Sequence, residues 1–123
     1  MDLKDLQNIV SKFIDDRDWR KFQTARDIAM SASVESNELL ELFLWDRNHD
    51  NEILNDKKLL KMVMNETSDV LFACLSMADH LNFDLERAFL EKMDELNKRY
   101  DINNVKGKNV KIPSPEHLNQ EDR

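Results

Sequence analysis

Hydrophobic residues recur every three or four positions along most of the chain, which is the spacing of amphipathic α-helices. The pattern predicts four helices, over residues 2–15, 26–45, 56–81 and 85–100. The segment between the first two helices is polar apart from two aromatic residues, Trp19 and Phe22, and predicts a connector. The Asn- and Asp-rich segment between the second and third helices predicts a loop that continues to residue 55.

Composition supports this helical interpretation. The chain of 123 residues holds one glycine and two prolines, and Pro113 and Pro115 both lie near its end. Because no residue before 107 breaks a helix, we expect an all-α fold, a four-helix bundle subunit. The regular pattern stops after residue 100, so we expect one domain over residues 1–100 and a polar tail over 101–123.

The apolar run at residues 70–75 is hydrophobic on every side of its predicted helix. A small bundle cannot cover all of this surface within one subunit, so we expect a homo-oligomer. Cys74 is the only cysteine, which excludes a disulfide within the chain. Its apolar neighbours predict a buried, inert thiol, and the cysteine count fits a reducing compartment.

Charge and hydropathy narrow the classes of partner. The formal net charge is −7 and no basic run occurs, which argues against binding to nucleic acid. No apolar run reaches the ~20 residues of a membrane span, and the N-terminus does not have the pattern of a signal peptide. We therefore expect a cytoplasmic protein that does not bind membranes.

Two acidic pairs lie within the most apolar helices: Glu35 with Glu38, and Glu66 with Asp69. Residues three apart share one helix face, so two such helices packed together would bring four carboxylates into one place. That arrangement is costly unless a hard cation neutralises it, and oxygen ligands favour Mg²⁺ or Mn²⁺. Acidic pairs at the same spacing also occur elsewhere in this acidic chain, so solvated helix faces remain the alternative.

A di-iron site in a helical bundle is the rival carboxylate centre, and it requires Glu-x-x-His motifs. His49 follows Asp46 at that spacing but lies in the predicted loop. Neither His80 nor His117 has an acidic residue three positions before it, so the di-iron interpretation fails.

The acidic pairs and their surroundings resemble the MazG-like all-α nucleoside triphosphate pyrophosphatases. The likeness is greatest to the short branch that acts on deoxycytidine triphosphate, and it covers roughly residues 6–100. Beyond the acidic pairs, it rests on these segments: Arg17-Asp18-Trp19 with Phe22 and Arg26, Glu38-Leu39-Leu40-Glu41-Leu42-Phe43-Leu44-Trp45, Ser68-Asp69-Val70-Leu71, Lys92-Met93 and Arg99-Tyr100.

The resemblance implies hydrolysis of nucleoside triphosphates between the α and β phosphates, with Mg²⁺ as the cofactor and Mn²⁺ as a possible substitute. It implies metal ligation by Glu35, Glu38, Glu66 and Asp69, and catalytic roles for Glu38 and Glu66. Which carboxylate takes the proton of water stays open, and Glu38 is the first expectation. It also implies substrate contacts from five residues: Trp19, Phe22 and Trp45 at the nucleobase, and Lys92 and Arg99 at the phosphates. For these residues, bundle ends and solvated charges remain the alternatives.

The resemblance leaves the substrate and the assembly open. Deoxycytidine triphosphate is the first expectation, but Leu96 stands where the family often has Asn, so other deoxynucleotides remain alternatives. The subunit would assemble as a dimer or a dimer of dimers. A non-catalytic helical interaction module with solvated acidic pairs is the alternative function.

Overall fold

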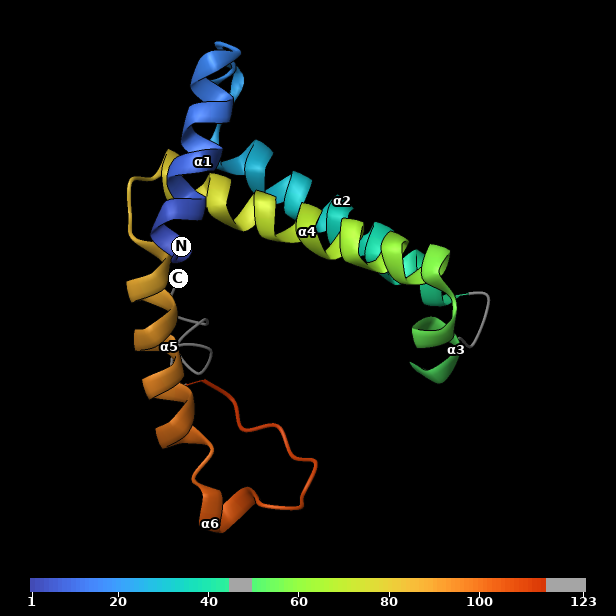
Figure 1. The fold of residues 1–123 in the computed structure, drawn as a ribbon. Helices are drawn as coiled ribbons and strands as arrows, with labels where there is room; N and C mark the ends of the chain where they lie inside the picture. Colours follow the sequence, from blue (N-terminus) through green and yellow to red (C-terminus); the bar gives the residue numbers. More distant parts are fainter. Residues whose placement is uncertain (45–49, 115–123) are drawn as a thin grey trace. The chain divides into compact units, whose positions relative to one another are not determined.

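The computed structural model describes residues 1–44 and 50–114, and every regular element in these ranges is helical (Figure 1). The all-α prediction is therefore confirmed. The elements are α1 (Leu3–Asp16), η1 (Arg20–Phe22), α2 (Ala25–Leu44), α3 (Asp50–Asn55), α4 (Lys57–His80), α5 (Leu85–Arg99) and α6 (Ile102–Val105). The chain divides into two compact units, Met1–Leu85 and Glu86–Arg123.

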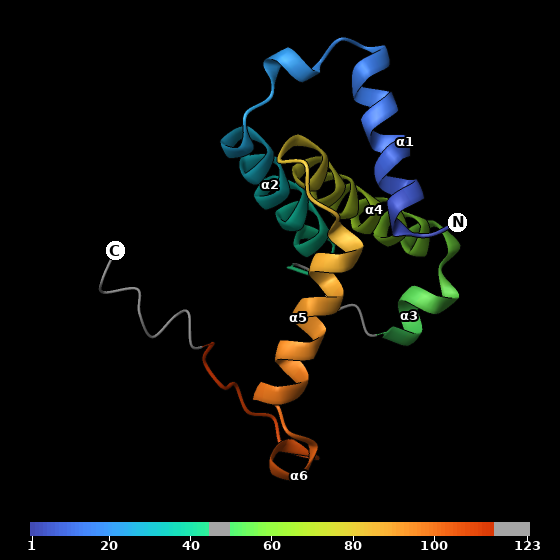
Figure 2. The same ribbon diagram turned by 90° about the vertical axis from the view of Figure 1, so that its left-hand side faces the viewer.

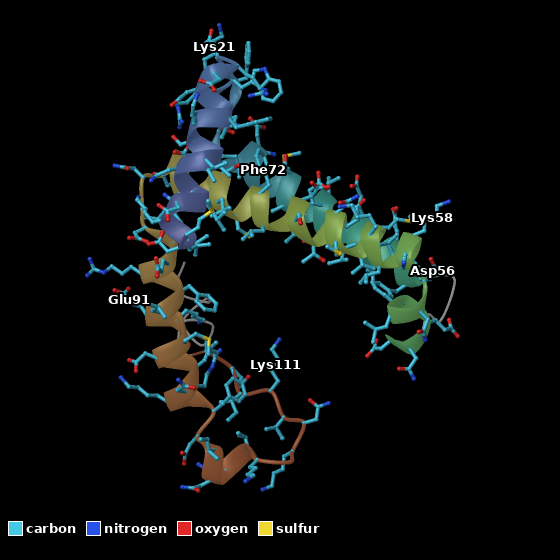
Figure 3. All side chains as sticks on the ribbon, viewed as in Figure 1. Lys21, Asp56, Lys58, Phe72, Glu91 and Lys111 are labelled. Atoms are coloured by element: carbon cyan, nitrogen blue, oxygen red, sulfur yellow. The ribbon has the colours of Figure 1, made fainter. Side chains whose placement is uncertain are left out.

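Side-chain caps define where the helices of the first unit begin. The Asp2 carboxylate accepts the Asp5 backbone N–H at 2.9 Å, and the Asp5 carboxylate accepts the Asp2 backbone N–H at the same distance. Thr24 Oγ1 accepts the Asp27 N–H at 3.1 Å at the start of α2. Asp56, at the start of α4 (Figure 3), accepts the N–H groups of the two residues after Lys57, each at 3.0 Å. Each cap satisfies donors that the helix itself leaves free, which is why short polar residues end these connectors.

The helices α2 and α4 lie side by side and run in opposite directions, and α1 packs on the C-terminal half of α4 (Figures 1 and 2). The core at this crossing is formed by Val10 and Ile14 of α1 with Leu75 of α4, and Ile14 is completely buried. Gln7 is a buried polar residue of the same region. Its amide donates to the Phe83 carbonyl at 2.9 Å and accepts the Leu85 N–H at 3.3 Å, so neither end of the amide lacks a partner.

Two predictions about the first unit are corrected. The loop predicted up to residue 55 contains the short helix α3, which packs against α4 through the buried side chain of Ile53. Cys74 is exposed, and its neighbours Ala73 and Leu75 take the buried positions. Successive residues of a helix point about 100° apart, so one face of the apolar run packs inward while Cys74 stays outside.

The second unit holds most of α5, the one-turn helix α6 and the segment that follows. Tyr100 connects the end of α5 to the segment after α6: its hydroxyl accepts the Ile112 N–H at 3.0 Å and donates to the Ile112 carbonyl at 3.2 Å. Gly107, at the turn between these ends, has a φ of 74°, which is a conformation that glycine adopts without strain. The predicted polar tail thus includes an anchored segment as far as residue 114.

Within the described ranges, no helix combines the length and the apolar character needed to cross a lipid bilayer.

Candidate functional site

The antiparallel pair α2 and α4 brings the four carboxylates of the two acidic pairs together. Glu35 and Glu38 come from α2, and Glu66 and Asp69 come from α4. One carboxylate oxygen of each lies within 4.8 Å of the others. The glutamates are half-buried and Asp69 is exposed, so the group is open to solvent on one side. We call these four residues the acidic cluster.

Two oxygens of the acidic cluster are buried without a hydrogen bond: Oε2 of Glu35 and Oε2 of Glu66. Burial raises the pKa of the Glu35 carboxyl, and a hydrogen bond shared with Glu38 and repulsion from the other carboxylates raise it further. Burial likewise raises the pKa of Glu66, together with repulsion from Glu38 and a shared hydrogen bond. Without a metal, Glu35 and Glu66 therefore keep their protons to higher pH than ordinary glutamates, because the negative charges of the acidic cluster repel one another.

A divalent cation fits this set of donors. All four ligands are carboxylate oxygens, which suit hard cations such as Mg²⁺ or Mn²⁺ rather than soft metals. Opposite ligands of an octahedral magnesium ion are roughly 4 Å apart, close to the 4.8 Å limit of the acidic cluster. A cation would also satisfy the two buried oxygens that have no partner.

A cavity of about 180 Å³ extends from the acidic cluster toward the beginning of α2. We call it the α2–α4 cavity; it is lined by Gln23, Asp27, Ile28, Ser31, Glu35, Asp69, Phe72, Ala73 and Ser76. On α2, Asp27, Ser31 and Glu35 recur every four residues and therefore lie along one face. On α4 the small side chains of Ala73 and Ser76 are buried, which leaves space between the helices. The cavity thus has carboxylates of the acidic cluster at one end and hydrogen-bonding groups at the other.

The predicted aromatic residue Trp19 connects to this cavity through two ring contacts. Trp19 meets Phe13 edge-on with ring centroids 5.8 Å apart, and Phe13 meets Phe72 in the same way at 5.8 Å. Phe72 lies on α4 in the half that α1 crosses (Figure 3) and lines the cavity. Trp19 remains 47% exposed and Phe22 71% exposed, and Lys21 Nζ lies 5.3 Å from the centre of the Phe22 ring.

The connector that carries these rings is held by Arg20. Its guanidinium donates to Asp15 on α1 and to Asp79 on α4, both at 2.7 Å, and to the Ser11 hydroxyl at 3.1 Å. These bonds raise the pKa of Arg20 above its ordinary value, and the bond from Arg20 lowers the pKa of Asp15. The Arg20 side chain therefore connects η1 to α1 and α4, shortly before Gln23, which lines the cavity.

A second hollow lies on the other side of the acidic cluster. It is lined by Glu38, Glu66, Glu41, Leu42 and Leu44. Glu41 repels the Glu66 carboxylate and contributes to its raised pKa. The negative field therefore extends along α2 beyond the four clustered residues.

The remaining predicted contacts lie elsewhere. Lys92 and Arg99 belong to the second unit, where both pair with Glu95, at 3.0 Å and 3.7 Å respectively. The Arg99 guanidinium also lies 5.2 Å from the centre of the Tyr100 ring. Trp45 falls outside the described residues.

Sequence reasoning did not identify the polar wall of the cavity, Gln23, Asp27 and Ser31. A signal existed for the last two, because they precede Glu35 at intervals of four residues and so share its helix face. No signal identified Gln23, because its place depends on how Arg20 holds the connector.

Comparisons with known proteins identify one family and several similar proteins. The model of the MazG-like family matches residues 30–112. The dCTP pyrophosphatase 1 of Rattus norvegicus is 31% identical over 107 residues, which cover 85% of this chain and 62% of that protein. The protein of the same name from Bos taurus is 28% identical over 117 residues, covering 94% of this chain and 69% of that protein.

A solved structure, a pyrophosphatase from Archaeoglobus fulgidus, has a TM-score of 0.70 and is 32% identical in sequence. The match covers 80% of this chain and 92% of that chain. By contrast, this chain spans less than two thirds of the length of the rat relative.

Proposed function

Because the chain belongs to the MazG-like family, we propose that it is a metal-dependent pyrophosphatase that hydrolyses nucleoside triphosphates to monophosphate and pyrophosphate. The observation that carries the proposal is the acidic cluster, with its buried, unpartnered oxygens of Glu35 and Glu66. Two findings add support: relatives named dCTP pyrophosphatase 1 and a solved pyrophosphatase with the same fold.

The residues that would hold the cation are Glu35, Glu38, Glu66 and Asp69, and Mg²⁺ is our choice, with Mn²⁺ as a substitute. When bound, such a cation neutralises phosphate charge and makes a bound water more acidic. The carboxylates alone would repel a triphosphate, because the substrate and the acidic cluster carry the same sign of charge. Activity should therefore depend on the metal rather than merely increase with it.

In the proposed reaction, the oxygen of water forms a bond to a phosphorus of the α–β linkage, and the bridging P–O bond breaks. Glu38 accepts the proton of that water. If the α-phosphorus is attacked, pyrophosphate leaves with the bridging oxygen and its electron pair; if the β-phosphorus is attacked, the nucleoside monophosphate leaves with them. Glu66, on the opposite helix, shares a hydrogen bond with Glu38 and would orient that carboxylate for the transfer. Proton transfer of this kind needs a carboxylate within hydrogen-bond reach of the water.

The nucleoside would occupy the α2–α4 cavity, with the phosphates over the acidic cluster. Stacking on Trp19 or Phe22 is supported by the exposure of both side chains and by the ring contacts that link Trp19 to the cavity wall. Trp45 would add a second stacking surface. The proposed phosphate contacts of Lys92 and Arg99 rest on the family resemblance alone. The names of the relatives favour deoxycytidine triphosphate as the substrate.

The active form is proposed to be a dimer or a dimer of dimers. Its support is the set of apolar side chains that one subunit leaves exposed along α2 and α4: Met30, Val34, Leu40, Leu44, Met62, Met64 and Leu71 are all 41% to 58% exposed. Large exposed apolar surface is typical of a protein interface. A monomer mass by light scattering at micromolar concentration would refute this assembly.

The activity is tested by incubating the protein with a panel of nucleoside triphosphates, with Mg²⁺ or with a chelator. We expect pyrophosphate to appear only with the metal, and turnover to fall by at least about a hundredfold in Glu38→Gln and Asp69→Asn. Circular dichroism should show that both variants keep their helices.

The matched control is Glu91→Gln. Glu91 also stands three residues from another acidic residue, Asp94, but it lies on the exposed surface of α5 and pairs with Arg87. Its turnover should equal that of the unaltered protein. Release of pyrophosphate from none of the nucleotides would refute the proposal and favour the non-catalytic interaction module.

A further inference from the structure

We propose that Asp27 forms a hydrogen bond to the nucleobase and thereby selects bases that carry an amino group, cytosine first among them. This inference rests on the proposed function and adds a determinant of substrate selectivity to it. Asp27 belongs neither to the acidic cluster nor to the aromatic connector.

The position of Asp27 along α2 matches the requirement. Asp27, Ser31 and Glu35 all line the α2–α4 cavity, and they lie on one face of the helix. Eight residues of α-helix separate the first from the last, a rise of about 12 Å. A nucleotide whose phosphates meet the acidic cluster therefore extends its base toward the first turn of α2, where Asp27 stands.

The opposite wall leaves room for a flat ring. Phe72 and Ala73 of α4 line the cavity together with Ser76, whose hydroxyl donates to the Phe72 carbonyl at 2.8 Å and so does not compete for the ligand. The Phe72 ring also meets the Phe13 ring edge-on. Phe72 therefore offers a stacking surface to a base, and the edge of a base stacked there would face the polar side chains of α2.

Asp27 keeps hydrogen-bonding capacity for such a ligand. Its Oδ2 accepts the Thr24 hydroxyl at 2.9 Å, and its backbone N–H completes the cap. Within residues 1–44 and 50–114, its Oδ1 has no hydrogen-bond partner. An ionised carboxylate only accepts hydrogen bonds, so this oxygen complements an N–H donor and disfavours a carbonyl.

Cytosine and uracil would interact differently with the Asp27 carboxylate. Cytosine presents an amino donor at the ring position where uracil presents a carbonyl acceptor. The carboxylate would bond to the first and repel the second. Gln23, the other polar side chain at this end of the cavity, has both a donor and an acceptor and therefore does not discriminate by itself.

The test compares kcat/KM for dCTP and dUTP in the unaltered protein and in Asp27→Asn. The two bases differ in this group and in the ring nitrogen beside it, which carries a hydrogen only in uracil. An amide of the same shape has both a donor and an acceptor, so it can serve either base. We expect the dCTP to dUTP ratio of kcat/KM to fall by about tenfold or more, because a hydrogen bond to a charged acceptor contributes at least that factor.

Asp27 also takes part in the cap at the start of α2, and Thr24→Val is the matched control for that role. It removes the hydroxyl that bonds to Asp27 but leaves the carboxylate in place. Loosening of α2 should lower turnover of both substrates alike, so the control should keep the original ratio.

Three results would overturn the inference. One is a ratio in Asp27→Asn equal to that of the unaltered protein, with both substrates hydrolysed. Another is an equal fall of the ratio in Thr24→Val. If no triphosphate is hydrolysed by the unaltered protein, the proposed function fails and this inference fails with it.

Discussion

The pair formed by Arg20 and Asp79 should stabilise the fold measurably, although most ion pairs on protein surfaces do not. Arg20 Nη1 lies 2.7 Å from Asp79 Oδ2, and the Asp79 side chain is only 12% exposed. Replacing either residue by alanine leaves the other charge without this partner. The matched pair is Lys12 with Asp16, which has the same 2.7 Å separation but side chains 76% and 53% exposed.

The difference in exposure sets the expected magnitudes. A hydrogen bond to a charged group contributes about 1.5–3 kcal/mol when it is shielded from water. The Arg20 side chain is 38% exposed, so solvent screening reduces the expected coupling energy to about 1–1.5 kcal/mol. For Lys12 and Asp16, which lie four residues apart on a helix, we expect about 0.3–0.5 kcal/mol.

Double-mutant cycles measured by urea unfolding provide the assay. Each cycle compares the free energies of unfolding of the unaltered protein, the two alanine variants and the double variant. For the Arg20 and Asp79 cycle, the coupling should persist at high salt, whereas that of the exposed pair should decline. Coupling energies that are equal in the two cycles would refute the argument, because burial of Asp79 would then have no energetic effect.

Two further predictions concern the acidic cluster and the core. Burial and mutual repulsion raise the pKa values of Glu35 and Glu66 above 4.5. The metal-free folded state therefore binds more protons than the unfolded state. The stability that these protons contribute is complete below about pH 4.5 and is lost as the pH rises through the raised pKa values. Glu66→Gln should therefore melt above the unaltered metal-free protein at pH 7, by a margin that narrows toward pH 5, and it should gain less from added Mg²⁺ in thermal melts; a margin that widens toward low pH would contradict the reasoning. Ile14→Val should lower the free energy of unfolding in urea by about 0.5–1.5 kcal/mol, because this side chain is completely buried. Ile9→Val on the same helix, at a side chain 53% exposed, should change it by no more than about 0.5 kcal/mol. Equal costs would argue against the α1–α4 core.

Local chemistry explains why the helices could be predicted from the amino-acid order. Apolar spacing and the near absence of glycine and proline specify helix, and Thr24 and Asp56 cap the helices next to them whatever lies further away. The pairing of Glu35 with Glu38 on one face follows equally from helix geometry. The helix α3 was missed because a helix of six residues has little periodicity, and packing against α4 stabilises it instead.

The tertiary structure decided which of these local features meet. Antiparallel packing of α2 on α4 brings the acidic pairs within 4.8 Å, whereas Glu91 and Asp94, at the same spacing, do not form part of such a group. The same packing leaves the cavity over Ala73 and Ser76, and thereby makes Asp27 a wall residue and not only a capping residue. Spacing along a helix determines which side chains share a face, but what that face meets depends on partners distant in sequence, and these appear only when the chain has folded.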